Sequence, residues 1–220
     1  MTDWNNKEEV LEAVKEDGYA LEQASEELRG DREVVLAAVK QCGGALEFAC
    51  EELRADIEVV LQAVSVKIGM QWGISLEFAS EELRADKEVV LAAIESECTA
   101  LAYASDELKA DREVVLAAIE WWGETYDLPE EDVEADDLPI QFADASLKTN
   151  REFLEKVVGL ISESHAHGSV YDLVIKALET DFSNKEKVMA VIKENKDFFE
   201  YVPEYLKNDP EFMKEVEQYL

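Results

Sequence analysis

The chain has 220 residues, and 47% of them are hydrophobic, a content typical of a folded protein rather than a disordered one. Its 52 acidic side chains outnumber the 21 basic ones and give a formal net charge of -31 at pH 7. This charge argues against nucleic acid and anionic membranes as partners, because both are bound mainly through basic side chains. It favours a basic protein partner, cations or simple solubility instead.

No apolar run approaches the roughly 18 residues that span a bilayer, and the first ten residues lack the features of a signal peptide. The three cysteines, Cys42, Cys50 and Cys98, form no Cys-x-x-Cys pair, which argues against a disulfide framework or a zinc knuckle. We therefore expect a protein of a reducing compartment such as the cytoplasm, without membrane insertion, whose free thiols are buried or half-buried.

The sequence repeats itself with a period of 25 residues, and this repeat predicts the domain organisation. The stretch DREVVLAAVKQCGGALEFACEELRA, which begins at Asp31, is the reference unit, and closer or weaker copies occupy the rest of the chain. We predict a single domain over residues 1–220 with seven units and a closing helix. In chain order the units span residues 6–30, 31–55, 56–85, 86–110, 111–149, 150–183 and 184–208, and the closing helix spans 209–220.

Each unit begins with a predicted helix of about ten residues, which we call the long helix. Aspartate or asparagine stands at its first position, as in Asn6 and Asp31, where the side chain can accept a hydrogen bond from free backbone N–H groups. The fifth, eighth and ninth positions are persistently apolar and lie on one helical face. In the central units the fourth to ninth positions are all apolar (VVLAAV), so we expect those helices to be buried on all sides. Outer units carry polar residues there, such as Glu9 and Glu12.

The second predicted helix of each unit reads ALEFACEELRA in the reference unit. Leu46, Ala49 and Leu53 form its apolar face, and the glutamates between them face water. Because a pair of short helices cannot bury its apolar face alone, the units must stack on one another. The predicted fold class is all-α, a solenoid of about seven short helical hairpins with a 25-residue period plus a closing helix. A compact bundle of the same hairpins is the alternative.

The pattern L-x-F-A-S-x-E-L-R-x-D-x-E-V-V-L-x-A-V is carried best by residues 46–64, 76–94 and 101–119. It resembles the helical repeat family known as domain of unknown function 4116, strongly over about residues 6–119 and weakly afterwards. The resemblance implies the stacked helical architecture. It implies no catalytic residue, because the family carries no established activity.

Three units are longer than 25 residues, and in each the extra residues fall between the two predicted helices. The longer connections are residues 65–73, 121–139 and 159–169. Equivalent turns of a solenoid line one edge, so we expect these connections to project from the same edge, where insertions often mark a binding face. They hold Trp72, Trp121 and Trp122, which either anchor a partner or fill gaps left by the longer loops.

The connection 121–139 carries eight acidic residues and no basic one, which suggests a solvated loop, a surface for a basic segment or a calcium loop. Its stretch DVEADD mimics the alternating acids of an EF-hand. However, Asp137 stands where the turn glycine belongs and Ala143 where the closing glutamate belongs. The partner-binding residues that we predict are Trp72, Trp121, Trp122, Glu130, Glu131, Asp132, Glu134, Asp136 and Asp137.

Other candidate sites have simpler explanations. His165 and His167 form a His-x-His pair that would need further ligands to hold a metal. Acid pairs such as Glu51 and Glu52 recur in every unit, which is typical of a solvated face rather than of an acid–base pair. A recurrent aromatic, Phe48 in the reference unit, is expected to pack between units rather than to form an exposed ladder. We therefore expect no catalytic residue, cofactor or metal.

These observations together predict a scaffold or adaptor rather than an enzyme. We expect it to bind a protein partner, basic in character, through the edge that carries the inserted loops. Two alternatives remain open at this point. One is a structural subunit of a larger assembly, which isolation as a stoichiometric complex would favour. The other is an acidic cation-binding protein, which calorimetry with calcium would test.

Overall fold

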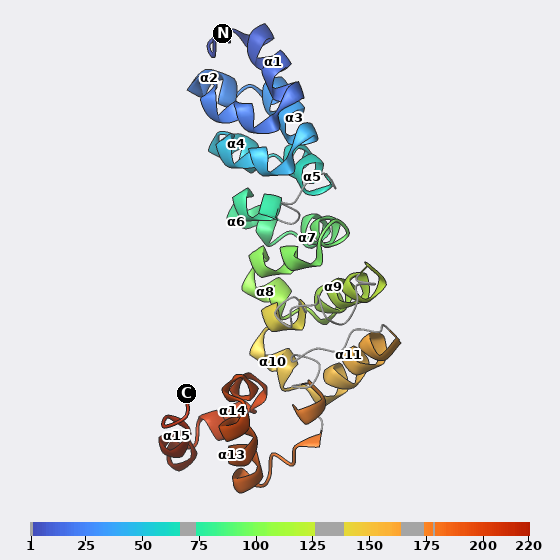
Figure 1. Cartoon of the computed structure of the whole chain (residues 1–220), viewed down its shortest axis with the longest axis vertical. Helices are drawn as coiled ribbons and strands as arrows, with labels where there is room; N and C mark the ends of the chain where they lie inside the picture. The colour runs from blue at the N-terminus through green and yellow to red at the C-terminus, as the bar shows by residue number, and fades with distance from the viewer. Residues whose placement is uncertain (1, 67–73, 126–138, 164–173, 178) are drawn as a thin grey trace. The chain divides into compact units, whose positions relative to one another are not determined.

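The computed structural model describes residues 2–66, 74–125, 139–163, 174–177 and 179–220 (Figure 1). Within these ranges every regular element is a helix. The chain forms two compact units, Met1–Trp121 (unit 1) and Trp122–Leu220 (unit 2), and each is described by itself. The all-α repeat fold is thereby confirmed, whereas the single domain over residues 1–220 stays a prediction.

Unit 1 is a stack of repeats, each with a long α-helix, a 3-10 helix and a single turn of α-helix. Its elements are α1 (Lys7–Glu16), η1 (Gly18–Gln23), α2 (Glu26–Arg29), α3 (Arg32–Gln41), η2 (Gly43–Phe48), α4 (Glu51–Arg54), α5 (Ile57–Val64), η3 (Ile74–Phe78), α6 (Glu81–Arg84), α7 (Lys87–Ile94), η4 (Cys98–Tyr103), α8 (Asp106–Lys109) and α9 (Arg112–Thr125). The helices α1, α3, α5 and α7 contact one another in succession, and so do η1 to η4. Each repeat therefore buries its apolar surface against the next.

The long helices begin at the aspartates and asparagines that the repeat predicts. In α3 the Oδ1 atom of Asp31 accepts hydrogen bonds from the backbone N–H groups of Glu33 at 3.0 Å and Val34 at 3.3 Å. Equivalent caps are made by Asp56, Asp86, Asp111 and Asp209. Each such cap typically contributes about 1 kcal/mol. The predicted starts of the long helices are therefore confirmed.

The long helices are not buried on all sides, so that expectation is wrong. The fourth, fifth, eighth and ninth positions are fully buried, as in Val34, Val35, Ala38 and Val39. Leu36 and Ala37, at the sixth and seventh positions, are only half-buried. A long helix in a one-layer stack has neighbours before and after it and the short elements of its own repeat behind it. Among the described residues, no element covers the remaining face completely, so Leu36 and Ala37 stay partly accessible to solvent.

The second predicted helix of each repeat is divided in two, which corrects the expectation of one continuous helix. Between η2 and α4 the backbone is extended at Ala49 and Cys50. This conformation directs the N–H of Cys50 to the carbonyl oxygen of Arg29 in the preceding repeat, at 3.1 Å. Ser80 and Ser105 donate in the same way to Arg54 and Arg84, both at 2.9 Å. The break in the helix therefore supplies a hydrogen bond between successive repeats.

Close packing between repeats requires glycine at position 43. A Cβ atom on Gly43 would lie 2.2 Å from the carbonyl oxygen of Ala63 and 2.5 Å from the Oγ of Ser75. Gly30 differs, because the nearest atom to a Cβ at that position is 3.5 Å away. Alanine takes the place of Gly30 in the later repeats, as at Ala55.

Unit 2 is built from the same kinds of element. They are η6 (Pro139–Phe142), α10 (Ala145–Lys148), α11 (Arg151–Glu163), α13 (Lys185–Glu194), η7 (Lys196–Tyr201), α14 (Glu204–Lys207) and α15 (Pro210–Val216). Phe198 is fully buried and stacks on Tyr201, with ring centroids 6.4 Å apart. Lys148 is only 5% exposed and donates from Nζ to the carbonyl oxygen of Gln141 at 2.6 Å. It also pairs with Glu200, which ties α10 to η7.

Candidate protein-interaction site

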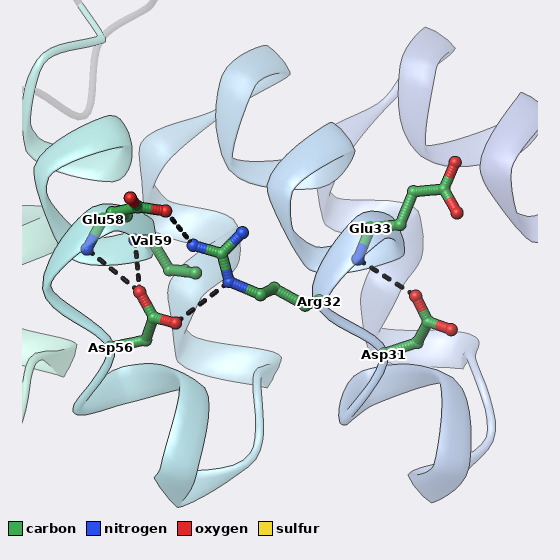
Figure 2. Close-up of polar contacts among 6 residues, drawn as sticks. All are labelled: Asp31, Arg32, Glu33, Asp56, Glu58 and Val59. Atoms are coloured by element: carbon green, nitrogen blue, oxygen red, sulfur yellow. Dashed lines mark hydrogen bonds and ion pairs between the residues drawn. The ribbon is translucent and has the colours of Figure 1, made fainter.

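A ladder of ion pairs runs along unit 1 at the N-terminal ends of the long helices. In each rung, the residue at the second position of one repeat, where its long helix begins, reaches the capping aspartate and the nearby glutamate of the next repeat. Figure 2 shows the rung in which Arg32 Nε lies 3.0 Å from Asp56 Oδ2 and the guanidinium also bonds Glu58. Equivalent rungs join Lys7 to Asp31 and Glu33, and Lys87 to Asp111 and Glu113, at 2.7–2.9 Å. In unit 2, Lys185 pairs with Asp209.

Each capping aspartate in the ladder uses its two oxygens for different tasks. Asp56 Oδ1 accepts from the N–H groups of Glu58 and Val59 at 3.0 and 3.1 Å, and Oδ2 receives the side chain of Arg32 (Figure 2). Arg32 beside it holds the pKa of the Asp56 carboxyl below its ordinary value. The Glu58 side chain is 76% exposed, and an exposed pair of this kind contributes little to stability because water screens it. The ladder therefore fixes side-chain positions more than it stabilises the fold.

One rung of the ladder lacks its cation. The second position of this repeat, where α5 begins, is Ile57, which is 43% exposed, so no basic side chain extends from this position toward α7. Asp86 still caps α7, with Oδ1 accepting from the N–H groups of Glu88 at 2.9 Å and Val89 at 3.1 Å. Across the described part of the chain, no cation pairs with the Asp86 or Glu88 carboxylate. Within the described ranges, these two carboxylates in ladder geometry therefore have no cationic partner.

The solvent-facing side of the long helices carries a row of leucines at the sixth position. The row consists of Leu11, Leu36, Leu61, Leu91 and Leu116, and all five are half-buried. The third and tenth positions lie on the same helical face as the sixth. On α7 and α9 both of these flanking positions hold exposed glutamates, namely Glu88, Glu95, Glu113 and Glu120. This face therefore presents an apolar row with acids on both sides.

The same face is hollowed between α1 and α3. A groove of about 640 Å³ lies there, lined by Leu11, Leu36 and Ala37 among others. At its tenth positions stand the exposed lysines Lys15 and Lys40, in place of the glutamates found further along the stack. The face therefore changes its charge along unit 1, from mixed at α1 and α3 to acidic at α7 and α9.

The two predicted tryptophan anchors that the structure describes both have packing roles. Trp121 is half-buried, and its Nε1 donates at 2.9 Å to the carbonyl oxygen of Glu95, one of the carbonyls left free at the end of α7. Trp122 is 3% exposed, so its ring belongs to the core. Burial of Trp122 supports the gap-filling interpretation, whereas a partner contact at Trp121 stays a prediction.

The remaining predicted contact residues lie outside the described residues. They are Trp72, Glu130, Glu131, Asp132, Glu134, Asp136 and Asp137. The calcium-like segment and the pair His165 and His167 fall there as well. Predictions for these residues stay predictions, as does the absence of enzymatic activity.

The other candidates agree with their structural explanations. Glu51 and Glu52 are exposed, as expected for a solvated face. Phe48 contacts Tyr19 edge to face, with ring centroids 6.2 Å apart, which supports packing between repeats. Cys98 is buried, while the other two cysteines are half-buried. The described residues contain no group of three potential metal ligands, and none of their helices is long and apolar enough to cross a bilayer.

Sequence reasoning missed the interrupted rung at Ile57, Asp86 and Glu88. The signal lies in comparing equivalent positions of neighbouring repeats, and it cannot be seen within one repeat. The second position holds a cation in most units and isoleucine in one, while the following unit keeps both acids. Aligning position 2 of each unit with positions 1 and 3 of the next would have shown the interruption.

The fold and this face together define an all-helical repeat protein with an acidic, leucine-lined surface. A family model described as Domain of unknown function (DUF4116) matches residues 6–54, 31–84, 56–109, 86–128 and 184–216, and the chain belongs to this family. The resemblance inferred from the repeat is thereby confirmed. No curated protein and no solved structure matches the chain.

Proposed function

We propose that the protein is a scaffold that binds a basic protein partner against the solvent-facing side of α5, α7 and α9. The observation that supports this proposal is the leucine row, which has glutamates on both sides at α7 and α9. Leu61, Leu91 and Leu116 offer apolar contact, and the flanking carboxylates offer partners for lysine and arginine. A segment that presents apolar and basic side chains on one face complements this surface in both shape and charge.

The acidic excess of the chain supports the same proposal through the rate of association. A net charge of -31 attracts a basic partner over a distance of about one Debye length and accelerates encounter at low salt. The stacked helices hold their glutamates at fixed positions, so little ordering of the scaffold itself is required on binding. The acidic connection 126–138 follows α9 directly in sequence, and the contacts predicted there form a separate part of the proposal.

Charge reversal at the tenth positions tests the location of the surface. In the full chain, we would replace Glu95 and Glu120 by lysine, and in a control of equal charge we would replace the exposed acids Glu27 and Glu107 of α2 and α8. A partner is captured from the source cells and identified, and its affinity is then measured by calorimetry. We expect about tenfold weaker binding for the Glu95 and Glu120 double variant, and near wild-type binding for the control.

Two outcomes would contradict the proposal. Equal weakening in both double variants would show that net charge alone attracts the partner, and unchanged binding in both would place the interface elsewhere. Replacing residues 126–138 by a short glycine-containing turn is a separate test of the acidic connection. Unchanged affinity in that variant would restrict the site to the helical face.

A further inference from the structure

The rungs of the ladder show what Asp86 and Glu88 are shaped to bind. In the neighbouring rungs, a lysine Nζ or an arginine Nε lies 2.7–3.0 Å from the Oδ2 atom of the capping aspartate. The bound group is an ammonium in two of these rungs and a guanidinium in the third. The same molecule therefore shows that this pair of carboxylates, in this geometry, holds an organic cation.

The interrupted rung keeps that geometry. The backbone angles at the cap are φ -84° and ψ 117° for Asp86, against φ -80° and ψ 113° for Asp56. Oδ1 of Asp86 is engaged by two backbone N–H groups of α7, as it is in Asp56. Since the cap fixes the carboxylate, its Oδ2 is oriented before any ligand arrives.

An exposed apolar side chain stands where the cation of the rung would begin. Among the described residues of unit 1, Ile57 is the single large hydrophobic side chain that is exposed. It cannot satisfy the two carboxylates of the next repeat, but it can contact an apolar group that arrives with a cation. Apolar and anionic groups are therefore adjacent at one point of the stack.

We propose that Asp86 and Glu88, together with Ile57, bind a lysine or arginine side chain of a protein partner. The partner's cation takes the place that Lys7, Arg32 and Lys87 occupy in the other rungs, and an apolar side chain next to it packs on Ile57. This inference rests on the proposed function, since it names a contact point for the basic partner. Because the carboxylates are partly solvated, the contact sets the register of the partner more than the total affinity.

The other rungs provide internal controls for a direct test. The probe is the dipeptide acetyl-Leu-Lys-amide, titrated into the full-length protein labelled with ¹⁵N. We expect saturable shifts of the backbone amides of Glu88 and Val89, and little change at Glu58 and Glu113, whose rungs are filled. Acetyl-Leu-Ala-amide, which lacks the cation, should produce no saturable shift.

Three substitutions test the same site from the protein side. Ile57→Lys supplies the missing cation within the chain, so it should abolish the saturable shifts at Glu88. Ile57→Met keeps an apolar side chain and should retain them, and Glu88→Gln should weaken them without removing the cap. Equal shifts at all rungs, or shifts at Glu88 that persist in Ile57→Lys, would overturn the inference. An intact thermal transition in each variant shows that the fold is retained.

Binding of the captured partner separates this inference from the proposed function. We expect Ile57→Lys to weaken binding of the partner at least threefold, and Ile57→Met, which keeps an apolar contact, to weaken it less. If Ile57→Lys binds normally while the Glu95 and Glu120 double variant does not, the inference fails and the proposed function stands. If neither variant weakens binding, both fail.

Discussion

We compare two contacts between successive long helices, which we call joints. The joint between α3 and α5 and the joint between α5 and α7 differ in whether their rung contains a cation. Both begin the second helix with a capping aspartate of nearly the same backbone conformation. In the first joint Arg32 fills the rung, and in the second Ile57 leaves it without a cation. Since the repeats stack in both, a filled rung is not required for stacking. The charged rungs thus vary between joints, whereas the buried core residues stay the same in kind.

The repeat at residues 56–85 departs from the reference pattern at both ends of α5. Ile57 replaces the cation at the N-terminal end, and one of the longer connections follows the C-terminal end. The core positions of α5 are unaffected, because Val59, Val60 and Ala63 are fully buried like their counterparts in α3. The departures fall where stacking does not constrain the sequence, which is where a binding function has room to vary.

A substitution in the buried core of a joint should change the free energy of unfolding more than the loss of any rung. Gly43→Ala places a methyl group against the carbonyl oxygen of Ala63, so we expect the free energy of unfolding to fall by about 2–3 kcal/mol. The control is Gly30→Ala, which should raise it by about 0.5 kcal/mol because the site has room. Urea denaturation followed by circular dichroism measures both. Similar losses in the two variants would contradict the assignment of Gly43 to a close contact.

Removal of a helix cap should have the next largest effect on stability, and the caps allow the two joints to be compared directly. Asp86→Ala removes a cap alone, at a cost of about 1 kcal/mol. Asp56→Ala removes a cap and breaks a rung, so we expect a further loss of up to about 1 kcal/mol. Thermal denaturation of both variants measures the difference. If Asp86→Ala were the more destabilising variant, the rung would not be the distinguishing feature of the joints.

Filling the interrupted rung should have a smaller, stabilising effect. Ile57→Lys brings an ammonium within reach of Asp86 and Glu88, and we expect about 0.5 kcal/mol of added stability. The reverse change, Arg32→Ile, should remove a similar amount from the neighbouring joint. Both effects should shrink in high salt, which screens exposed charges. A loss of stability in Ile57→Lys at low salt would show that the rung geometry is not available there.

The effect on pH dependence should be the smallest. The pKa of Asp56 is lowered in the folded state by Arg32, so the stabilisation is fully present above the ordinary aspartate pKa of about 3.9. It is lost as the pH falls through the lower pKa of the folded state. A carboxyl NMR titration of Arg32→Gln should show the pKa of Asp56 raised, whereas Lys7→Gln should leave it unchanged. An unchanged pKa in Arg32→Gln would exclude the pair as the cause.

The fold was largely accessible from the sequence because its determinants are local and repeated. The period, the aspartate caps and the buried face of each helix follow from residues within one unit. The break at Cys50 was missed, although the equivalent serines followed by two acids in other units carry the signature of a helix start. The sequence shows that a residue is apolar, but it does not show how many neighbours a stack provides. Half-exposed Leu36 was therefore predicted to be buried.

The candidate site was harder to predict from the sequence than the fold, for a physical reason. Aromatic residues in long connections suggest interfaces, yet Trp122 is buried and Trp121 bonds to the end of α7. The site at Ile57 depends on an absence, namely a cation that neighbouring repeats have and this one lacks. The structure shows which positions to compare, because the side chains that touch in the filled rungs lie 24 to 26 residues apart.

That spacing also bears on how unit 1 folds during synthesis. Rungs join residues 24 or 26 positions apart, and the bond from Cys50 to Arg29 spans fewer. Contacts this close in sequence have a small entropy of loop closure and are associated with fast folding. As the chain leaves the ribosome, each repeat can dock on the one before it without waiting for distant segments. Assembly can therefore proceed one layer at a time.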